Sequence, residues 1–316
     1  MTSVATIVAD VRARGDEAVA EWAIRLDGVA PAPARAGAAV PSAELRALAK
    51  SVREWHEAQR PADVRLSPTD GVELERRWVP LSSVGIYVPR GLISTLVMCA
   101  VPAQTAGVDR IVVMTPPDGA DVVAATAALF GIEEVWAIGG PHAIAALAYG
   151  TEQIEKVDKI VGPGNAFVNE AKLLVSADVP IDLPAGPSEV VVLLSDETLE
   201  DIALAEMAAQ QEHGPDSRCR LVRQAGDPER ALAEIEELAP EHLVLLGSEA
   251  EKLAPRIRNA GAVFVGPYSP VAAGDYASGG NHVLPTGGWA RVTGGIGIET
   301  YLKPITTQRI TAEGLA

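Results

Sequence analysis

Cysteine is scarce in this chain, and its two cysteines are not spaced as metal ligands. Cys99 and Cys219 are the only ones among 316 residues, and each lies in an apolar run. Metal sites built from cysteine place these residues in closely spaced pairs, which this sequence lacks. We therefore expect two buried, unreactive thiols, as is usual in a reducing cytoplasm.

Long apolar runs and an excess of basic residues are also absent. No run approaches the roughly 18 apolar residues that a membrane-spanning helix needs. The N-terminal stretch includes Asp10, Arg12 and Glu17, which argues against a signal peptide. A formal net charge of −16 argues against a nucleic-acid-binding surface. The sequence thus indicates a cytoplasmic protein that contacts neither membranes nor nucleic acids.

Apolar residues make up 48% of the chain and follow a pattern typical of α/β proteins. Helices are predicted over residues 4–26, with a break at Gly15-Asp16, and over 42–59. Residues 72–88 alternate like strands. Helical stretches, the last at 249–259, then alternate with short apolar strands; these strands are expected at 110–114, 134–138, 159–161, 189–194, 218–222, 242–246 and 262–265. We therefore predict two Rossmann-like α/β domains.

Two glycine turns open predicted helices, at Gly139-Gly140 and at Gly162-Pro163-Gly164-Asn165. Glycine allows backbone N–H groups at a helix N-terminus to approach a phosphate. The strict dinucleotide fingerprint GxGxxG is absent, however. From spacing alone, the second turn is equally well explained as a phosphate-binding loop or as a tight structural turn.

Gln210 and His213 lie three residues apart in the last turn of a predicted helix, so they project from one face. A ring nitrogen and an amide oxygen placed in this way can share one metal ion. Residues at a helix end are more often caps or solvent-exposed side chains, and the spacing alone favours that explanation. Asp275, much later in the chain, would supply a third ligand.

A second polar pair, Glu241-His242, follows another predicted helix. Imidazole titrates near neutral pH, so His242 is suited to accept a hydroxyl proton, while Glu241 can activate water. Adjacent residues on a strand point to opposite faces. Both side chains can therefore reach one site only if the backbone turns at Pro240. The alternative is a helix-to-strand junction with one side chain in solvent.

Six sequence blocks occur in the order found in the histidinol dehydrogenase family, and the chain resembles that family over nearly its whole length. The blocks are GIYVP (residues 85–89), VDKIVGPGNAFVNEAK (157–172), LPAGPSEV (183–190), QQEHGPDS (210–217), APEHL (239–243) and GDYASGGNHVLPT (274–286). Six ordered blocks are far more specific than any one of them.

The resemblance implies a zinc-dependent, NAD-linked enzyme that oxidises an amino alcohol to the acid in two steps. The residues matching functional positions are the zinc ligands Gln210, His213 and Asp275, the catalytic pair Glu241 and His242, the cofactor contacts Tyr87, His142 and Asn165, and the substrate contacts Ser188 and His282. His282 is also a candidate fourth ligand. The family has glutamine at the position of His142. Ser188 is not expected to be a nucleophile, because no GxSxG elbow surrounds it.

The resemblance also implies a domain arrangement and a homodimer. Residues 87–187 are expected to form a NAD-binding domain inserted into a catalytic domain made of residues 1–86 and 188–290. Residues 291–316 are expected to form a tail that crosses to the partner subunit. The chain is shorter than the family between QQEHGPDS and APEHL, where it is expected to lack a helix-strand unit.

The family continues into a helical C-terminal domain that carries a histidine zinc ligand and a substrate-binding glutamate, and the sequence stops before it. From this we expect the substrate to be a primary amino alcohol other than L-histidinol. One alternative is a genuine L-histidinol dehydrogenase. Another is a non-catalytic relative that binds a nucleotide or a partner.

Overall fold

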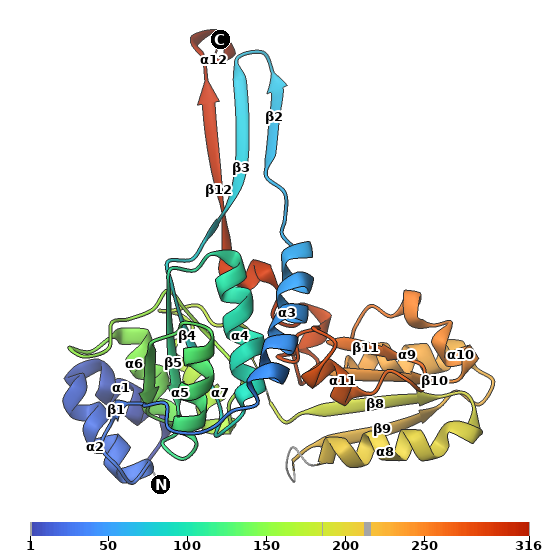
Figure 1. Cartoon of the computed structure of the whole chain (residues 1–316). Helices are drawn as coiled ribbons and strands as arrows, with labels where there is room; N and C mark the ends of the chain where they lie inside the picture. The colour runs from blue at the N-terminus through green and yellow to red at the C-terminus, as the bar shows by residue number, and fades with distance from the viewer. Residues whose placement is uncertain (1, 185, 212–215, 316) are drawn as a thin grey trace.

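Two α/β lobes and a narrow projecting arm make up the chain (Figure 1). The computed structural model describes residues 2–184, 186–211 and 216–315. Each lobe is built on a mostly or wholly parallel sheet, and the arm is a three-stranded antiparallel sheet that carries the C-terminal end of the chain away from both lobes. Within the described part of the chain, the helices are too short or too polar to cross a membrane.

The first sheet has the strand order β1-β6-β5-β4-β7. Its strands are β1 (Ala32–Pro33), β4 (Ser83–Tyr87), β5 (Arg110–Thr115), β6 (Glu134–Ala137) and β7 (Lys159–Val161). All are parallel except the short β1. The chain builds outward from β4 through β5 to β6 and then crosses back to place β7 on the other side of β4. The strand order therefore reverses between β4 and β7, where open α/β sheets usually bind ligands.

Helices cover both faces of this sheet, which explains why β4 is buried along its whole length. One face packs against α3 (Ser42–Ala58), α4 (Ile93–Ala106) and α5 (Ala120–Leu129). The other packs against α1 (Val4–Arg14), α2 (Asp16–Leu26), α6 (Gly140–Tyr149) and α7 (Ala166–Val175). Residues 4–58 were expected to share a domain with residues 188–290, and their helices pack on the first sheet. The domain boundaries themselves remain a prediction.

The second sheet is wholly parallel, with the order β11-β10-β8-β9. Its strands are β8 (Glu189–Leu194), β9 (Arg218–Arg223), β10 (His242–Leu246) and β11 (Ala262–Val265). Apolar side chains on one face pack against α8 (Glu200–Gln211) and α11 (Val271–Tyr276). The opposite face packs against α9 (Pro228–Leu238) and α10 (Ser248–Glu251). The prediction of two Rossmann-like sheets is confirmed.

The arm consists of β2 (Val64–Thr69), β3 (Val72–Pro80) and β12 (Leu302–Ile310), and it ends in the short α12 (Ala312–Leu315). The strand order is β12-β3-β2, and each pair is antiparallel. A strand from the last part of the sequence thus completes a hairpin formed by residues 64–80. Most of its side chains are exposed.

One local prediction was wrong and one short helix was missed. A helix was expected at residues 249–259, but α10 ends at Glu251 and only a 3-10 turn, Ala254–Arg256, follows. Pro255 lacks a backbone N–H and its ring clashes with the preceding turn, which disfavours a continuous α-helix through this position. The helix α11 had not been predicted, because its six residues are too few for a helical period to be visible.

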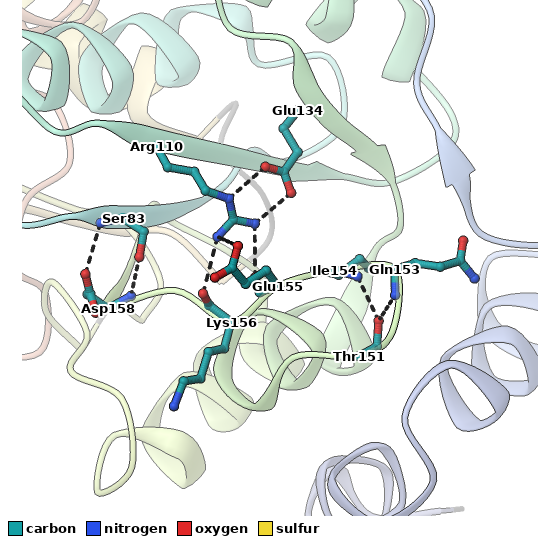
Figure 2. A network of polar contacts seen from close by, with 9 residues as sticks. All are labelled: Ser83, Arg110, Glu134, Thr151, Gln153, Ile154, Glu155, Lys156 and Asp158. Carbon is teal, nitrogen blue, oxygen red and sulfur yellow. Dashed lines mark hydrogen bonds and ion pairs between the residues drawn. The ribbon is translucent and has the colours of Figure 1, made fainter.

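Polar contacts tie together the amino ends of the first sheet's strands (Figure 2). Arg110 donates to both carboxylate oxygens of Glu134 at 2.9 and 2.8 Å, and to the carbonyls of Glu155 and Lys156 at 3.1 and 3.3 Å. Ser83 and Asp158 exchange backbone-to-side-chain hydrogen bonds of 3.0 Å. These bonds join the starts of all four parallel strands, and the opposite, carboxyl edge of the sheet carries the candidate cofactor contacts described below.

Candidate active site

The candidate catalytic residues lie at the amino edge of the second sheet, where β8 and β10 start side by side. His242, the first residue of β10, is in register with Val190 of β8. Ser188 and Glu241 immediately precede the two strands, so the parallel pairing brings them together. Residues from two distant blocks of the sequence therefore share one small volume.

Glu241 is buried and organises the polar contacts of this edge. Its Oε2 accepts hydrogen bonds from the Ser188 hydroxyl at 2.6 Å and from the Glu189 backbone N–H at 2.8 Å. The Ser188 oxygen in turn accepts a hydrogen bond of 2.6 Å from Nε2 of Gln210. A continuous chain of bonds thus connects Gln210 at the end of α8 to Glu241 at the start of β10. Ser188 serves as the bridge.

The tautomer of His242 follows from its surroundings. Its Nδ1 lies 3.0 Å from the carbonyl oxygen of Glu189 and 3.5 Å from Oε2 of Glu241. A carbonyl can only accept, so Nδ1 carries the proton and Nε2 is the basic nitrogen. The ring lies 6.0 Å from that of Phe264, centre to centre. A neutral His242 ring therefore has its lone pair on Nε2, an atom that is buried in this structure.

Glu241 and His242 approach the same site although they are adjacent in sequence. The backbone turns just before them, at Ala239, which ends α9 in a left-handed conformation with φ of 46°. Glu241 itself precedes the first strand residue, so the alternation of a regular strand does not apply to it. The turn that this arrangement requires had been expected at Pro240 and occurs one residue earlier.

A cavity of about 1020 Å³ opens beside these residues, between the two lobes. His242, Asp275 and His282 line it from the second lobe, and Trp55 lines it from α3 of the first. Nδ1 of His282 donates to the backbone carbonyl of Asp275 at 3.2 Å and lies 4.0 Å from its carboxylate Oδ1. Its Nε2 is 3.2 Å from the hydroxyl of Thr95 on α4. His282 thus links the wall that carries Asp275 to the first lobe.

The described part of the expected zinc site suits a metal that prefers nitrogen and oxygen ligands. Because Nε2 of Gln210 is directed at Ser188, the amide oxygen is the atom of this side chain that can bind a cation. Asp275 is 8% exposed and contributes a carboxylate to the cavity wall. Among the residues the structure describes, no three His, Cys, Asp or Glu side chains form a metal cluster. His213, the remaining expected ligand, lies outside the described residues.

The expected cofactor contacts lie at the carboxyl edge of the first sheet. Tyr87 ends β4, and Asn165 follows β7, so both are at the point where the strand order reverses. Asn165 caps α7 by accepting hydrogen bonds of 3.1 Å from the N–H groups of Phe167 and Val168. A side chain at Gly162 would place its Cβ only 2.2 Å from the carbonyl oxygen of Tyr87. Only glycine allows the two strand ends to approach so closely.

His142, the third expected cofactor contact, is fully buried. Its Nε2 lies 3.1 Å from Oδ2 of Asp27, the residue that caps the C-terminus of α2. Sequence reasoning missed Asp27. A usable signal was its position, because a carboxylate at a helix C-terminus is unfavourable to the helix dipole and needs another partner.

The turn after β7 depends on a buried ion pair that sequence reasoning also missed. Lys172 and Asp182 are 2.5 Å apart, and each side chain is only 1% exposed. Lys172 also donates to the carbonyl of Gly162 at 2.8 Å, and Asp182 accepts from the backbone N–H of Gly162 at 2.8 Å. The pair therefore holds both polar groups of the glycine that opens this turn. A lysine inside the block VDKIVGPGNAFVNEAK was the available signal.

His56, and the two cysteines that were expected to be buried and unreactive, lie away from the catalytic pair. His56 is fully buried, and its Nδ1 is 2.7 Å from the carbonyl of Val52, as expected for a packing histidine; burial lowers its pKa. Cys99 is buried, and burial raises the pKa of its thiol. Cys219 is only partly buried, so the prediction of two buried thiols holds for Cys99 alone.

Known proteins resemble this chain over almost its full length. A histidinol dehydrogenase of Aliivibrio fischeri is 38% identical over 370 positions, which cover 99% of this chain and 83% of the relative. A histidinol dehydrogenase of Methanothermobacter thermautotrophicus is 40% identical, and the alignment covers 86% of that relative. The crystal structure of histidinol dehydrogenase from Elizabethkingia anophelis superposes with a TM-score of 0.87 at 33% identity, covering 99% of this chain and 85% of that one.

The family sequence model for histidinol dehydrogenase matches residues 1–227 and 224–316. The two segments meet between β9 and α9, in the interval where the chain was expected to be shorter. The alignment with the Aliivibrio protein has 370 positions against 316 residues here, so that relative has residues within the aligned region that this chain lacks.

These relatives contradict the expectation of a substrate other than L-histidinol. That expectation rested on residues beyond the end of the sequence. The identity to proteins named histidinol dehydrogenase instead extends over 99% of the chain, including every block that carries a candidate site residue. With the family match spanning both lobes and the arm, the chain belongs to the histidinol dehydrogenase family.

Proposed function

We propose that this chain is an L-histidinol dehydrogenase that oxidises its alcohol substrate to the carboxylate with NAD as the electron acceptor. The observation that carries the proposal is the amino edge of the second sheet. There, buried Glu241 is bonded to Ser188, and through it to Gln210, directly beside His242. His242 shares a cavity of about 1020 Å³ with Asp275. The candidate base His242 and the candidate metal ligand Asp275 thus line one space large enough for a small molecule, and the Glu241–Ser188–Gln210 bonds lie directly behind His242.

The histidinol dehydrogenase family uses zinc and NAD. The amide oxygen of Gln210 and the carboxylate of Asp275, with His213, would hold zinc. Tyr87 and Asn165, at the reversal point of the first sheet, would hold NAD. Held by these residues, zinc would supply Lewis-acid chemistry at the alcohol oxygen, and NAD would supply the hydride acceptor.

The protein's own part in the first oxidation is to remove the hydroxyl proton. Nε2 of His242 is the basic nitrogen, because Nδ1–H is committed to the carbonyl of Glu189. The same bond fixes the ring, so the proton acceptor is oriented before the substrate arrives. Phe264 and His282 line the cavity beside His242, and they confine the substrate next to this histidine.

The second oxidation requires water, and Glu241 is placed to activate it. Its carboxylate is held at Oε2 by the Ser188 hydroxyl and the Glu189 N–H. These bonds orient the carboxylate beside His242, where an aldehyde retained in the cavity would be attacked. Complete oxidation consumes one water and two NAD and releases two NADH, whereas oxidation that stops at the aldehyde releases one.

The test is to incubate purified protein with L-histidinol, NAD and zinc, and to measure NADH and histidine. We expect two NADH for each histidine formed. Removal of zinc with a chelator should lower NADH formation by more than about 100-fold, because the metal stabilises the developing charge on oxygen by several kcal/mol. Zinc content, measured independently by atomic absorption, should be about one per chain before chelation.

Restoring zinc, but not magnesium, should recover the activity, since magnesium binds poorly to a mixed nitrogen and oxygen site. NADH formation that is unchanged in zinc-free protein would contradict the metal assignment. Zinc and NAD binding without any oxidation of L-histidinol would favour the non-catalytic alternative.

We also propose that the chain forms a homodimer through the arm. Apolar side chains on the arm and its tip stand in solvent in the single chain: Val64, Leu66, Ile310 and Leu315 are 51–81% exposed. Exposed apolar groups on a projecting element are typical of a surface that another chain covers. Light scattering should give about twice the chain mass of 32.9 kDa. Leu66→Asp should shift it toward the monomer, whereas Val292→Asp, at an exposed site off the arm, should not.

A further inference from the structure

The carboxylate of Asp27 holds the turn that connects β6 to α6. Its Oδ2 accepts hydrogen bonds from the backbone N–H of Gly139 at 2.9 Å and from Nε2 of His142 at 3.1 Å. The Asp27 side chain is 10% exposed and that of His142 is not exposed at all. These two bonds more than offset the effect of burial and lower the pKa of Asp27, so the carboxylate stays ionised. Burial makes the bonds stronger than they would be in water.

The same contacts determine which protons His142 carries. Since Nε2–H donates to Asp27, a neutral ring has its lone pair on Nδ1. Nδ1 has no hydrogen-bond partner among the described residues, and it lies beside the Gly140 backbone, 3.5 Å from where a Cβ would be. Nδ1 is inaccessible to solvent. His142 is therefore built into the turn through its bond to Asp27.

The β6–α6 turn, which Asp27 holds, also contacts Tyr87. The backbone N–H of Gly140 donates to the Tyr87 hydroxyl oxygen at 3.2 Å. Burial raises the pKa of Tyr87 to about 12, and the nearby charge of Asp27 acts in the same direction, so the phenol keeps its proton. With its oxygen accepting from Gly140, the hydroxyl is oriented to donate its hydrogen to a third group. Tyr87 ends β4 at the reversal point of the sheet, where a nucleotide is expected to lie.

The N-terminus of α6 consequently cannot bind a phosphate in the usual way, because the N–H groups of Gly139 and Gly140 are already occupied. Instead, the Tyr87 hydroxyl accepts the Gly140 N–H of this helix terminus and can itself donate a hydrogen bond to a further group. An O–H that accepts one hydrogen bond becomes a better donor in the next, since bonded chains polarise one another.

We propose that Asp27 and His142 form a positioning pair that sets the β6–α6 turn so that Tyr87 donates its hydroxyl hydrogen to an oxygen of NAD. This proposal rests on the proposed function, in that NAD is the ligand. Neither Asp27 nor His142 touches the cofactor; both act through Gly140 and Tyr87.

The test is equilibrium binding of NAD by calorimetry, with zinc and alcohol left out. Asp27→Asn should raise the Kd for NAD about tenfold, a typical coupling between neighbouring polar groups. Tyr87→Phe should cause a similar loss. Once Tyr87 is phenylalanine, adding Asp27→Asn should cost less than about a further twofold, because the group through which Asp27 acts is gone. His142→Gln keeps a side-chain N–H donor for Asp27 and should stay within about threefold of the unaltered protein.

The matched control is Asp10→Asn. Asp10 lies in α1 on the same N-terminal helical pair and accepts a hydrogen bond of 2.8 Å from the Trp22 indole, but it does not contact the turn. It should lower thermal stability and leave the Kd for NAD unchanged. Should Asp27→Asn not fold, Asp27→Glu, which keeps the charge and displaces it, takes its place.

The positioning role would be overturned if Asp27→Asn changed only thermal stability, or if it weakened NAD binding equally with and without the Tyr87 hydroxyl. It would also be overturned if Asp10→Asn weakened binding as strongly. In each of these cases the unaltered chain still binds NAD and the proposed function stands. Failure of the unaltered chain to bind NAD would overturn the proposed function, and the role of the pair with it.

Discussion

Replacing Glu241 with glutamine is expected to lower the rate of histidine formation from L-histidinol by a factor of about 10² to 10⁴, the usual contribution of a general base. Glutamine has nearly the same size and still offers an oxygen to the Ser188 hydroxyl and the Glu189 N–H, the two groups that Glu241 holds. What it cannot do is accept a proton from water. The loss should therefore appear in the rate and not in folding.

The number of NADH molecules released per alcohol tests the role of Glu241 more specifically than the rate does. If Glu241 acts in the hydration step and His242 in the first proton removal, Glu241→Gln should release about one NADH per alcohol in a single turnover, with aldehyde as the product. His242→Ala should instead suppress both steps. Trapping the aldehyde with a hydrazine reagent and counting NADH by absorbance would measure this directly.

The control for Glu241→Gln is Glu189→Gln. Glu189 is the neighbouring acidic residue at the start of β8, and its carboxylate bonds to Arg218 at 3.3 Å and to the backbone N–H of Gly287 at 3.2 Å. These contacts lie outside the Ser188–Glu241 chain, so the rate should change less than about threefold. Equal losses in both variants would mean that the acidity of this edge matters in general, and would contradict a specific role for Glu241.

Replacing Lys172 with methionine is expected to destabilise the protein by about 3–5 kcal/mol, the largest effect on stability that the structure indicates. Methionine fills a similar volume but leaves the Asp182 carboxyl buried and without its partner at 2.5 Å. It also removes the hydrogen bond to the Gly162 carbonyl. The unfolding midpoint in urea should fall accordingly, and NAD binding should weaken because the β7–α7 turn loses its support.

Two further variants separate the buried charge from the general effect of losing a lysine. Adding Asp182→Asn to Lys172→Met removes the uncompensated charge and should recover part of the lost stability, since an amide oxygen can still accept from Gly162. Lys252→Met breaks a surface pair with Glu249 whose lysine is 67% exposed, and it should change stability by less than about 1 kcal/mol. A small effect of Lys172→Met would mean that water or a rearranged Asp182 replaces the lysine.

The local pattern of apolar residues predicted most of the helices and strands. The helical and strand periods of that pattern depend only on residues that are close together in the sequence. The strands at residues 159–161, 189–194, 242–246 and 262–265 were predicted with the boundaries that the structure has. The end of α10 at Glu251, ahead of Pro255, and the six-residue α11 were missed, since one depends on a single residue and the other is too short to show a period. The arm was missed as a unit because β12 and β3 are far apart in sequence.

The sequence by itself determined the α/β class, the family and the residue types of the candidate site, because these follow from periodicity and from ordered blocks. Only the tertiary structure decided which of those residues act together. Ser188 and Glu241 are 53 positions apart, and Asp27 and His142 are 115 apart. Parallel pairing of β8 with β10 joins the first two, and packing of α2 on the first sheet joins the others. Such contacts depend on the three-dimensional register of whole elements, which no local pattern of residues encodes.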